Sequence, residues 1–164
     1  RFHVVRHCTW ALENVRKRVQ TKLLTEQRKY FKRSRKLLLA HMSDLSAENK
    51  AAVERMLLMS RDLREAYLLK EKFYDFMDSP DSLQAKERLR TFRAHAFVTD
   101  LPDFSKCLTM LRNWEPYILN AFDCTYSNGF TEGINNKIKV LKRIAFGYRN
   151  FRNFRTRILC TTNV

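Results

Sequence analysis

Residues that interrupt helices are scarce in this sequence, and their scarcity constrains the fold more than any other feature. Only three of the 164 residues are glycine and three are proline, the two residues that most disfavour a helix interior. Hydrophobic residues make up 45% of the chain, which is enough for a buried core and argues against global disorder. No apolar run approaches the roughly 20 residues of a membrane span, so we expect no membrane partner. The sequence therefore predicts an all-α chain of long helices.

Apolar side chains recur at helical spacing along most of the chain. The first helix is expected to run to about residue 24, on an apolar stripe formed by Val5, Cys8, Leu12, Val15, Val19 and Leu23. A small helical bundle should follow, with Ser46 and Ser60 as N-caps and Pro80 in the first turn of a later helix. Trp10 and Trp114 are predicted to be packing residues. The other expected core positions are Val53, Met56, Leu57, Leu63, Tyr67, Leu68, Phe73, Leu83, Leu89, Phe92, Phe97, Phe104, Leu108, Leu111, Tyr117, Ile118 and Phe122.

Charge is segregated along the sequence. Residues 1–39 hold 12 basic and 2 acidic residues (net +10), residues 40–127 hold 12 and 14 (net −2), and residues 128–164 hold 8 and 1 (net +7). Two basic ends around a near-neutral middle favour a polyanionic partner that is held by the ends. The pattern predicts nucleic acid as that partner, and a solvated basic surface or an anionic membrane are the weaker alternatives.

Cysteine and histidine positions argue against a zinc site. The four cysteines are Cys8, Cys107, Cys124 and Cys160. They are far apart and form no C-x-x-C pair, so we expect reduced cysteines that act as small hydrophobic side chains in the cytosol. His3 and His7 have a spacing that can bind zinc, but no third ligand stands beside them. We expect them to be packing residues, with metal binding as the alternative.

A helix near the C-terminus carries the feature that is most relevant to chemistry. After a turn-rich loop at 123–129, a helix is expected over 130–143, with a buried face formed by Phe130, Ile134, Ile138, Leu141 and Ala145. Its polar face carries residues at spacings i, i+4, i+7 and i+11, namely Glu132, Asn136, Lys139 and Arg143. Glu132 is the only acidic residue after Asp123. It is either a helix-start acid, worth roughly 0.3–1 kcal/mol through the helix dipole, or a ligand for a hard cation such as Mg²⁺.

The final helix is expected to bury one face and to present a basic one. The expected buried residues are Phe151, Phe154 and Ile158. Aromatic and basic side chains are mixed in Tyr148, Arg149, Arg152 and Arg155. Such a surface can follow phosphates while the aromatic ring stacks on a base. The competing interpretation is that the arginines are only solvated.

Several segments of the chain together form one recognisable sequence signature. They read YSNGFTEGINNKIK at 126–139, VLKR at 140–143, FGYRNF at 146–151 and RIL at 157–159, and the chain opens with RFHVV at 1–5. Together these segments resemble DDE transposases of bacterial insertion sequences, and most closely the family named after ISL-three. In that family an aspartate commonly precedes the opening string. The helices between these two ends of the chain resemble the family only in their general helical character.

The resemblance implies a catalytic domain with an RNase H-like α/β fold, in which two strand-borne aspartates act with a glutamate on a later helix. Glu132 corresponds to that glutamate, as catalytic residue and metal ligand. The strands and both aspartates would lie upstream of Arg1. Residues 1–7 would begin the helix that follows those strands, 8–122 would form a helical insertion domain, and 123–164 would hold the C-terminal helices of the catalytic domain.

The function implied is metal-dependent DNA cleavage and strand transfer during transposition, in the bacterial cytoplasm and in association with the nucleoid. Mg²⁺ or Mn²⁺ would be the cofactor once the upstream aspartates are present. The partners would be transposon ends and target DNA, and a homo-oligomer is possible. The expected DNA-binding residues are Asn136, Lys139, Lys142, Arg143, Arg149, Arg152 and Arg155. By itself the chain is expected to bind DNA without cutting it, because one carboxylate cannot hold two cations.

Two other interpretations stay open. The chain can be a non-catalytic basic helical module that binds nucleic acid, with Glu132 as an ordinary helix-start acid. It can also be the remnant of a truncated gene, with no stable role. The sequence contains no P-loop and no discernible Ser-His-Asp or Cys-His arrangement.

Overall fold

A computed structural model describes residues 2–33, 35–124 and 129–162. The chain divides into two compact units, Arg1–Cys124 and Thr125–Val164, which we call the N-terminal and the C-terminal unit and describe separately. All regular secondary structure in the described ranges is helical, so the all-α prediction is confirmed for this chain. Among the described residues, none of the helices combines the length and the hydrophobicity that a bilayer span requires.

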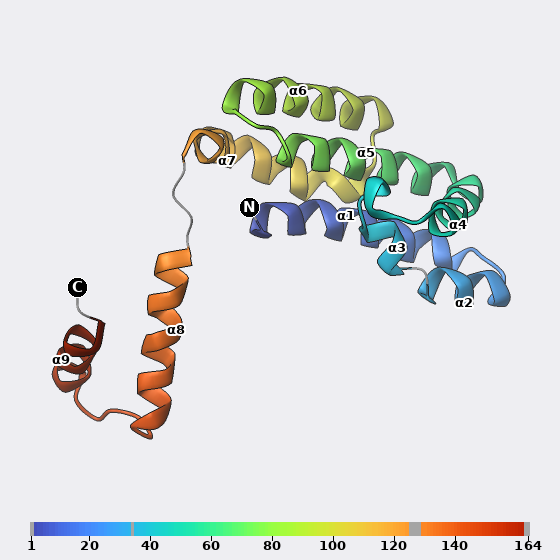
Figure 1. The fold of residues 1–164 in the computed structure, drawn as a ribbon. Helices are drawn as coiled ribbons and strands as arrows, with labels where there is room; N and C mark the ends of the chain where they lie inside the picture. Colours follow the sequence, from blue (N-terminus) through green and yellow to red (C-terminus); the bar gives the residue numbers. More distant parts are fainter. Residues whose placement is uncertain (1, 34, 125–128, 163–164) are drawn as a thin grey trace. The chain divides into compact units, whose positions relative to one another are not determined.

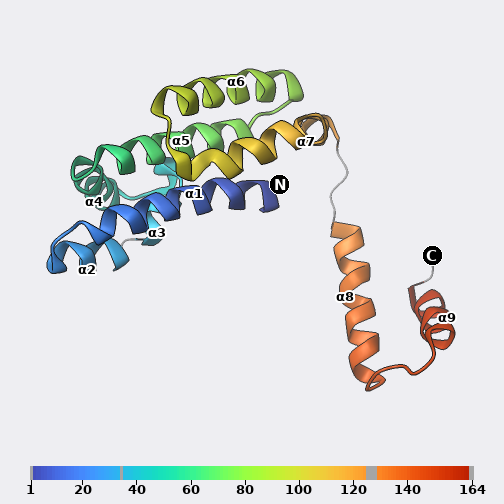
Figure 2. The ribbon, with the colours of Figure 1, turned by 180° about the vertical axis from the view of Figure 1, so that it is seen from behind.

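The N-terminal unit is a layered helical bundle centred on α5 (Figures 1 and 2). Helix α6 forms one layer, α5 and α7 the next, and α1 the layer beyond, with α5 in contact with α1, α4 and α6. The elements are α1 (Phe2–Thr21), α2 (Thr25–Arg33), α3 (Arg35–Leu39), the 3₁₀ turn η1 (Met42–Asp44), α4 (Ala47–Leu58), α5 (Arg61–Met77), α6 (Ser82–Thr99), the 3₁₀ turn η2 (Pro102–Phe104) and α7 (Ser105–Asp123).

Aromatic rings fill the centre of this bundle. Phe73 lies edge-on to Phe76 and Phe92, with ring centroids 5.6 and 5.4 Å apart, and Phe76 also contacts Phe122 of α7 at 5.5 Å. Edge-to-face pairs of this kind stabilise a core beyond the area that they bury. The predicted stripe of α1 is confirmed by its buried members Cys8, Leu12, Val15 and Val19 and by its partly buried members Val5 and Leu23.

Two of the three predicted helix starts are confirmed. The Ser46 side chain accepts a hydrogen bond from the backbone N–H of Asn49 at 3.4 Å, and Ser60 accepts one from Leu63 at 3.3 Å. Pro80 was predicted in the first turn of α6, and this is wrong. Asp81 is the N-cap, with its carboxylate accepting from the N–H of Gln84 at 2.7 Å. An extended aspartate supplies that acceptor, so the helix starts after it.

Replacing Ser60 by alanine is expected to lower the free energy of unfolding by about 1 kcal/mol, because the Leu63 N–H loses its acceptor at the start of the central helix. Urea unfolding followed by circular dichroism measures this change. Ser60→Asp keeps a capping oxygen and should retain the stability of the parent chain. Equal stability of the alanine and parent proteins would contradict a capping role.

Four predicted core residues are exposed instead, namely Leu68, Leu83, Phe97 and Tyr117. Helix α6 explains two of them, since its buried face is formed by Ala85, Leu89, Phe92 and Ala96. Small alanines let α6 approach its neighbours closely, and Leu83 and Phe97 then lie on other sides of the helix. Trp10 and Trp114, which the sequence predicts to be packing residues, are 50% and 57% exposed, and their rings contact those of His7 and Tyr117, respectively.

Part of the N-terminal positive charge is bound within the unit. Arg18 donates to Asp62 at 2.6 Å and to Asp103 at 3.0 Å, and so joins α1 to α5 and η2. Glu13 accepts from Arg16 at 2.6 and 2.8 Å and pairs with Arg35 at 3.1 Å. Burial alone would raise the pKa of the Glu13 carboxyl, but the two guanidinium groups lower it overall. These arginines therefore hold helices together. The charge count alone could not distinguish such internal pairs from cations that bind a partner.

Cys8 and Cys107 meet in the core although 98 residues separate them in the sequence. Both are buried, and burial, with Cys107 adding to it, raises the pKa of the Cys8 thiol well above its ordinary value. Their predicted role as small hydrophobic side chains is confirmed by this burial. The same prediction is wrong for Cys124 and Cys160, which are exposed.

The C-terminal unit is a helical hairpin of α8 (Gly129–Ile144) and α9 (Phe151–Thr162). Of its predicted apolar faces, Ile134, Ile138, Leu141, Ala145, Phe154 and Ile158 are half-buried. Phe130 and Phe151 are 73% and 75% exposed, so their predicted burial is wrong in this chain. Within this unit α8 and α9 contact each other along one side of each helix, and Phe130 and Phe151 lie outside that contact.

The turn between the two helices has a left-handed backbone at two successive residues. Phe146 has φ 52° and Gly147 has φ 99°. The N–H of Gly147 donates to the carbonyl of Lys142, and that of Phe146 to the carbonyl of Arg143, both at 3.1 Å. This is the Schellman pattern that ends many helices, but its first left-handed position is usually glycine. For a residue with a side chain the conformation costs roughly 1–2 kcal/mol.

Candidate functional site

Glu132 lies in the first turn of α8 with its side chain exposed. The helix forms here because Ile134, Ile138 and Leu141 recur at helical spacing and turn toward α9, which leaves the other face to polar residues. A carboxylate at this end of a helix is favoured by the helix dipole. Its exposure leaves it accessible to a partner molecule, and no core packing depends on it.

The predicted polar face of α8 is present as a continuous exposed surface. Asn136, Lys139 and Arg143 follow Glu132 on that face, and Lys142 lies beside them in the last turn. All four are exposed. At a rise of about 1.5 Å per residue, the face extends roughly 16 Å from Glu132 to Arg143. It therefore joins one carboxylate to one amide and three cations that can hold a phosphate backbone.

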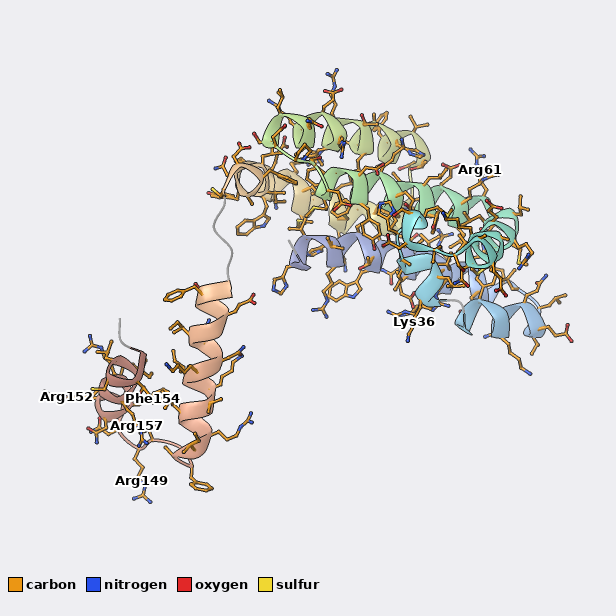
Figure 3. The ribbon with its side chains drawn as sticks, viewed as in Figure 1. Lys36, Arg61, Arg149, Arg152, Phe154 and Arg157 are labelled. Atoms are coloured by element: carbon orange, nitrogen blue, oxygen red, sulfur yellow. The ribbon has the colours of Figure 1, made fainter. Side chains whose placement is uncertain are left out.

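The turn and α9 carry the remaining residues that the sequence predicts as DNA contacts, and the structure shows which of their side chains are accessible. Arg149 extends from the turn, and Arg152 projects from α9 (Figure 3); both are exposed, as is Arg155. Tyr148 was predicted to stack on a base. Its ring instead packs on Phe154, with centroids 4.7 Å apart, and its hydroxyl is enclosed. The Tyr148 ring thus belongs to the small core of the hairpin.

Sequence reasoning missed two residues of this unit. The Lys137 ammonium donates to the backbone carbonyl of Thr161 at 2.8 Å and ties α8 to the end of α9. Phe146 is fully exposed at the turn, with 101% relative exposure. Its position beside a glycine was a signal for a turn, but not for which residue takes the left-handed conformation.

The described residues include no group of three or more His, Cys, Asp or Glu side chains that could hold a metal ion. His7 instead lies edge-on to Trp10, with centroids 6.1 Å apart. His3 and His7 both line a shallow, mostly apolar hollow of about 300 Å³ together with Trp114 and Ile118. Glu132 therefore belongs to no such group in the described part of the chain.

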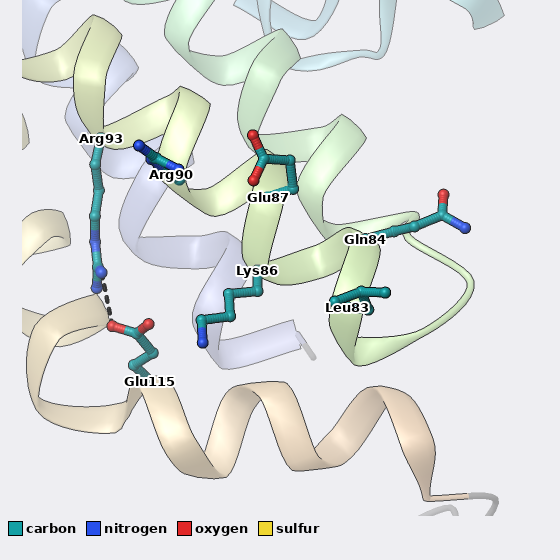
Figure 4. Close-up of a pocket in the computed structure, with 7 residues that line it drawn as sticks. All are labelled: Leu83, Gln84, Lys86, Glu87, Arg90, Arg93 and Glu115. Atoms are coloured by element: carbon teal, nitrogen blue, oxygen red, sulfur yellow. Dashed lines mark hydrogen bonds and ion pairs between the residues drawn. The ribbon is translucent and has the colours of Figure 1, made fainter.

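One of the larger hollows of the N-terminal unit is lined mainly by charged side chains. This hollow of about 550 Å³ lies over α6 and α7 and is lined by Leu83, Gln84, Lys86, Glu87, Arg90, Arg93 and Glu115 (Figure 4). Within it the guanidinium of Arg93 donates to the carboxylate of Glu115 at 2.6 Å. Charges of both signs alternate there, and the ion pair links the two helices. We therefore assign this hollow a structural role.

The chain matches the model of the ISL3 family of DDE transposases, described as "Transposase", over residues 1–158. Because the match covers almost the whole chain, the protein belongs to this transposase family. Its similarity to the family, seen above in the residues around Glu132, thus extends through the intervening helices.

One curated relative carries a different name. A protein of Lactococcus lactis subsp. lactis named "ATP-dependent protease" is 35% identical over 136 residues, which cover 82% of this chain and 39% of that protein. The chain thus spans about two fifths of the length of this relative. No solved structure matches the chain.

Proposed function

We propose that this chain provides the glutamate helix and a DNA-holding hairpin of a transposase that cleaves and joins DNA strands with Mg²⁺ or Mn²⁺. The observation that carries the proposal is the position of Glu132. It is the only acidic residue of 124–164, and it lies at the head of a helix face whose other charges are all positive. A carboxylate in that setting can hold a cation while the basic residues neutralise DNA phosphates.

The metal pair requires further ligands. Two divalent cations about 3.5–4 Å apart polarise the attacking and leaving oxygens in phosphoryl transfer, and they need several carboxylates. We propose that aspartates upstream of Arg1 supply them, that 8–122 is an insertion between those strands and the glutamate helix, and that 123–164 completes the catalytic domain. The exposed apolar residues Phe130 and Phe151 would then pack on the missing strands. DNA cleavage would take place at the bacterial nucleoid.

A protease activity is not proposed for this chain. An ATP-binding P-loop needs closely spaced glycines followed by lysine, and the three glycines here are Gly129, Gly133 and Gly147, none of which precedes a lysine. The name of the Lactococcus relative is therefore not carried over to these residues.

The isolated chain is expected to bind DNA with little sequence preference and with a steep salt dependence. Lysine and arginine contacts to phosphates release counterions, so the logarithm of the binding constant should fall linearly with the logarithm of salt concentration. Fluorescence anisotropy with an arbitrary duplex measures the slope. A flat response, or no binding at low salt, would contradict the proposal.

Charge reversal should locate the binding surface. Changing Lys139, Lys142 and Arg143 together to glutamate is expected to weaken DNA binding by at least tenfold at about 0.1 M salt, because three phosphate contacts become repulsive. The matched control changes Arg55, Arg61 and Arg64, which are exposed on α4 and α5 of the near-neutral segment; Arg61 is visible in Figure 3. Equal losses in the two triple variants would argue against a localised site.

A further inference from the structure

We infer that the ring of Phe146 is a stacking platform for an unpaired nucleobase of DNA, held at the turn between α8 and α9. This inference deepens the proposed function and rests on it, because it requires that the basic hairpin binds DNA. It specifies the form of DNA that the turn recognises, which is a strand with a base outside the double helix.

The first observation is the conformation of Phe146. Its backbone is left-handed (φ 52°) and its side chain is fully exposed (101%). A bulky residue rarely adopts this conformation, and here the ring gains no burial within the chain in return. Two backbone hydrogen bonds, to the carbonyls of Lys142 and Arg143, fix the conformation. Strained residues held rigidly in this way often mark binding positions.

The second observation is the charge around the ring. Lys142 and Arg143 precede Phe146 and Arg149 follows it, and all three are exposed. Residues 133–164 contain no acidic side chain. Figure 3 shows Arg149 extending away from the ribbon at this turn. An aromatic ring with exposed cationic residues shortly before and after it in the chain fits a base with its neighbouring phosphates, since the ring stacks on the base while the cations hold the backbone.

The third observation is that the neighbouring ring is already used. Tyr148 packs on Phe154 at 4.7 Å and is half-buried, which leaves Phe146 as the ring that the turn presents. Phe146 follows Glu132 by 14 residues, which corresponds to about 21 Å along a helix. That length equals roughly six base steps. Phe146 is therefore a positioning residue: it holds the DNA at a point several base steps from the phosphate that reacts.

The test compares the parent chain with Phe146→Leu and Phe146→Trp in anisotropy measurements. The probes are a duplex, the same duplex with one unpaired adenine, and a single strand. Phe146→Leu keeps an apolar side chain but removes the ring, so binding to the two probes with unpaired bases should weaken by roughly ten- to one-hundredfold. Binding to the intact duplex and its salt dependence should change little. Phe146→Trp should retain the preference for unpaired bases.

The matched control is Phe97→Leu, since Phe97 is 86% exposed on α6 of the other unit; it should leave all three affinities unchanged. If Phe146→Leu binds all three probes as the parent chain does, the stacking role is overturned while the DNA-binding function stands. If the parent chain binds no probe at low salt, the proposed function is overturned as well. If Phe146→Leu alters only self-association in sedimentation, the ring belongs to a protein interface and the inference is wrong.

Discussion

In a full-length protein with its upstream aspartates, Glu132→Gln is expected to lower strand cleavage by at least about a hundredfold while folding and DNA binding stay nearly intact. Glutamine keeps the shape of the side chain but loses the negative charge that offsets two adjacent cations. Changing even an outer-shell partner of a metal ligand costs about 10- to 100-fold, so losing a direct ligand should cost more. Cleavage of a transposon-end duplex in Mg²⁺, followed on a denaturing gel, measures the effect.

Glu48→Gln is the matched control for this change. Glu48 is also exposed in the first turn of its helix, α4, so both substitutions remove the same helix-dipole contribution of roughly 0.3–1 kcal/mol. Cleavage by the Glu48 variant should be normal. If the Glu132 variant also cleaves normally, Glu132 is only a helix-start acid, and the alternative of a non-catalytic DNA-binding module is favoured.

Sequence periodicity predicted the helices of this protein well because it reports on local geometry. The stripe of α1 and the caps at Ser46 and Ser60 depend on residues within a few positions of one another. The polar face that begins at Glu132 is of the same kind, since one helix carries all of it. Such features can be predicted without knowing which helices pack against one another.

Contacts between distant segments could not be predicted in the same way. The meeting of Cys8 with Cys107 depends on how α1 packs against α7, and Arg18 reaches Asp62 and Asp103 only after three elements have assembled. The left-handed Phe146 was hidden for a different reason. Where phenylalanine and glycine are adjacent, sequence rules predict the left-handed conformation for the glycine. The hydrogen bonds that end α8 instead require it at Phe146, and Gly147 adopts it as well.

Lys70 is the residue that sequence periodicity most clearly passed over. It lies on the buried stripe of α5, in helical register between Ala66 and Phe73, and it is fully buried. Its ammonium group pairs with Glu71 and donates to the carbonyl of Ala40, and it lies 3.9 Å from the centre of the Tyr67 ring. Burial lowers the pKa of Lys70, and Glu71 opposes this shift.

Glu71→Ala is therefore expected to lower the free energy of unfolding by about 3–5 kcal/mol, the usual cost of leaving a buried charge unpaired. The carboxylate also accepts from the backbone N–H of Met42 at 3.1 Å and contacts His41 at 3.1 Å, so the connection between α3 and α4 loses its anchor too. Urea unfolding followed by circular dichroism measures the loss. Lys70→Met, which removes the charge and keeps an apolar chain of similar length, should cost much less.

The matched control is Glu65→Ala on the same helix. Glu65 pairs with His95 at 3.1 Å, but both side chains are partly exposed, so its removal should cost less than about 1 kcal/mol. Similar losses for the two alanine variants would contradict a buried charge at Lys70.

The pH dependence of the Glu71→Ala loss gives an independent check on its cause. A folded-state pKa of Lys70 below its ordinary value means that the unfolded chain binds more protons between the two values, so stability rises with pH in that window. Glu71 raises the pKa of Lys70 in the folded chain, so its removal should lower that pKa further. Stability should then begin to rise at a lower pH in the variant than in the parent chain. The stability gap between Glu71→Ala and the parent chain should thus narrow as the pH rises through the range between the folded-state pKa values of Lys70 in the two proteins. A gap that stays constant over this range would show that the loss comes from the hydrogen bond to the Met42 N–H, and not from the charge on Lys70.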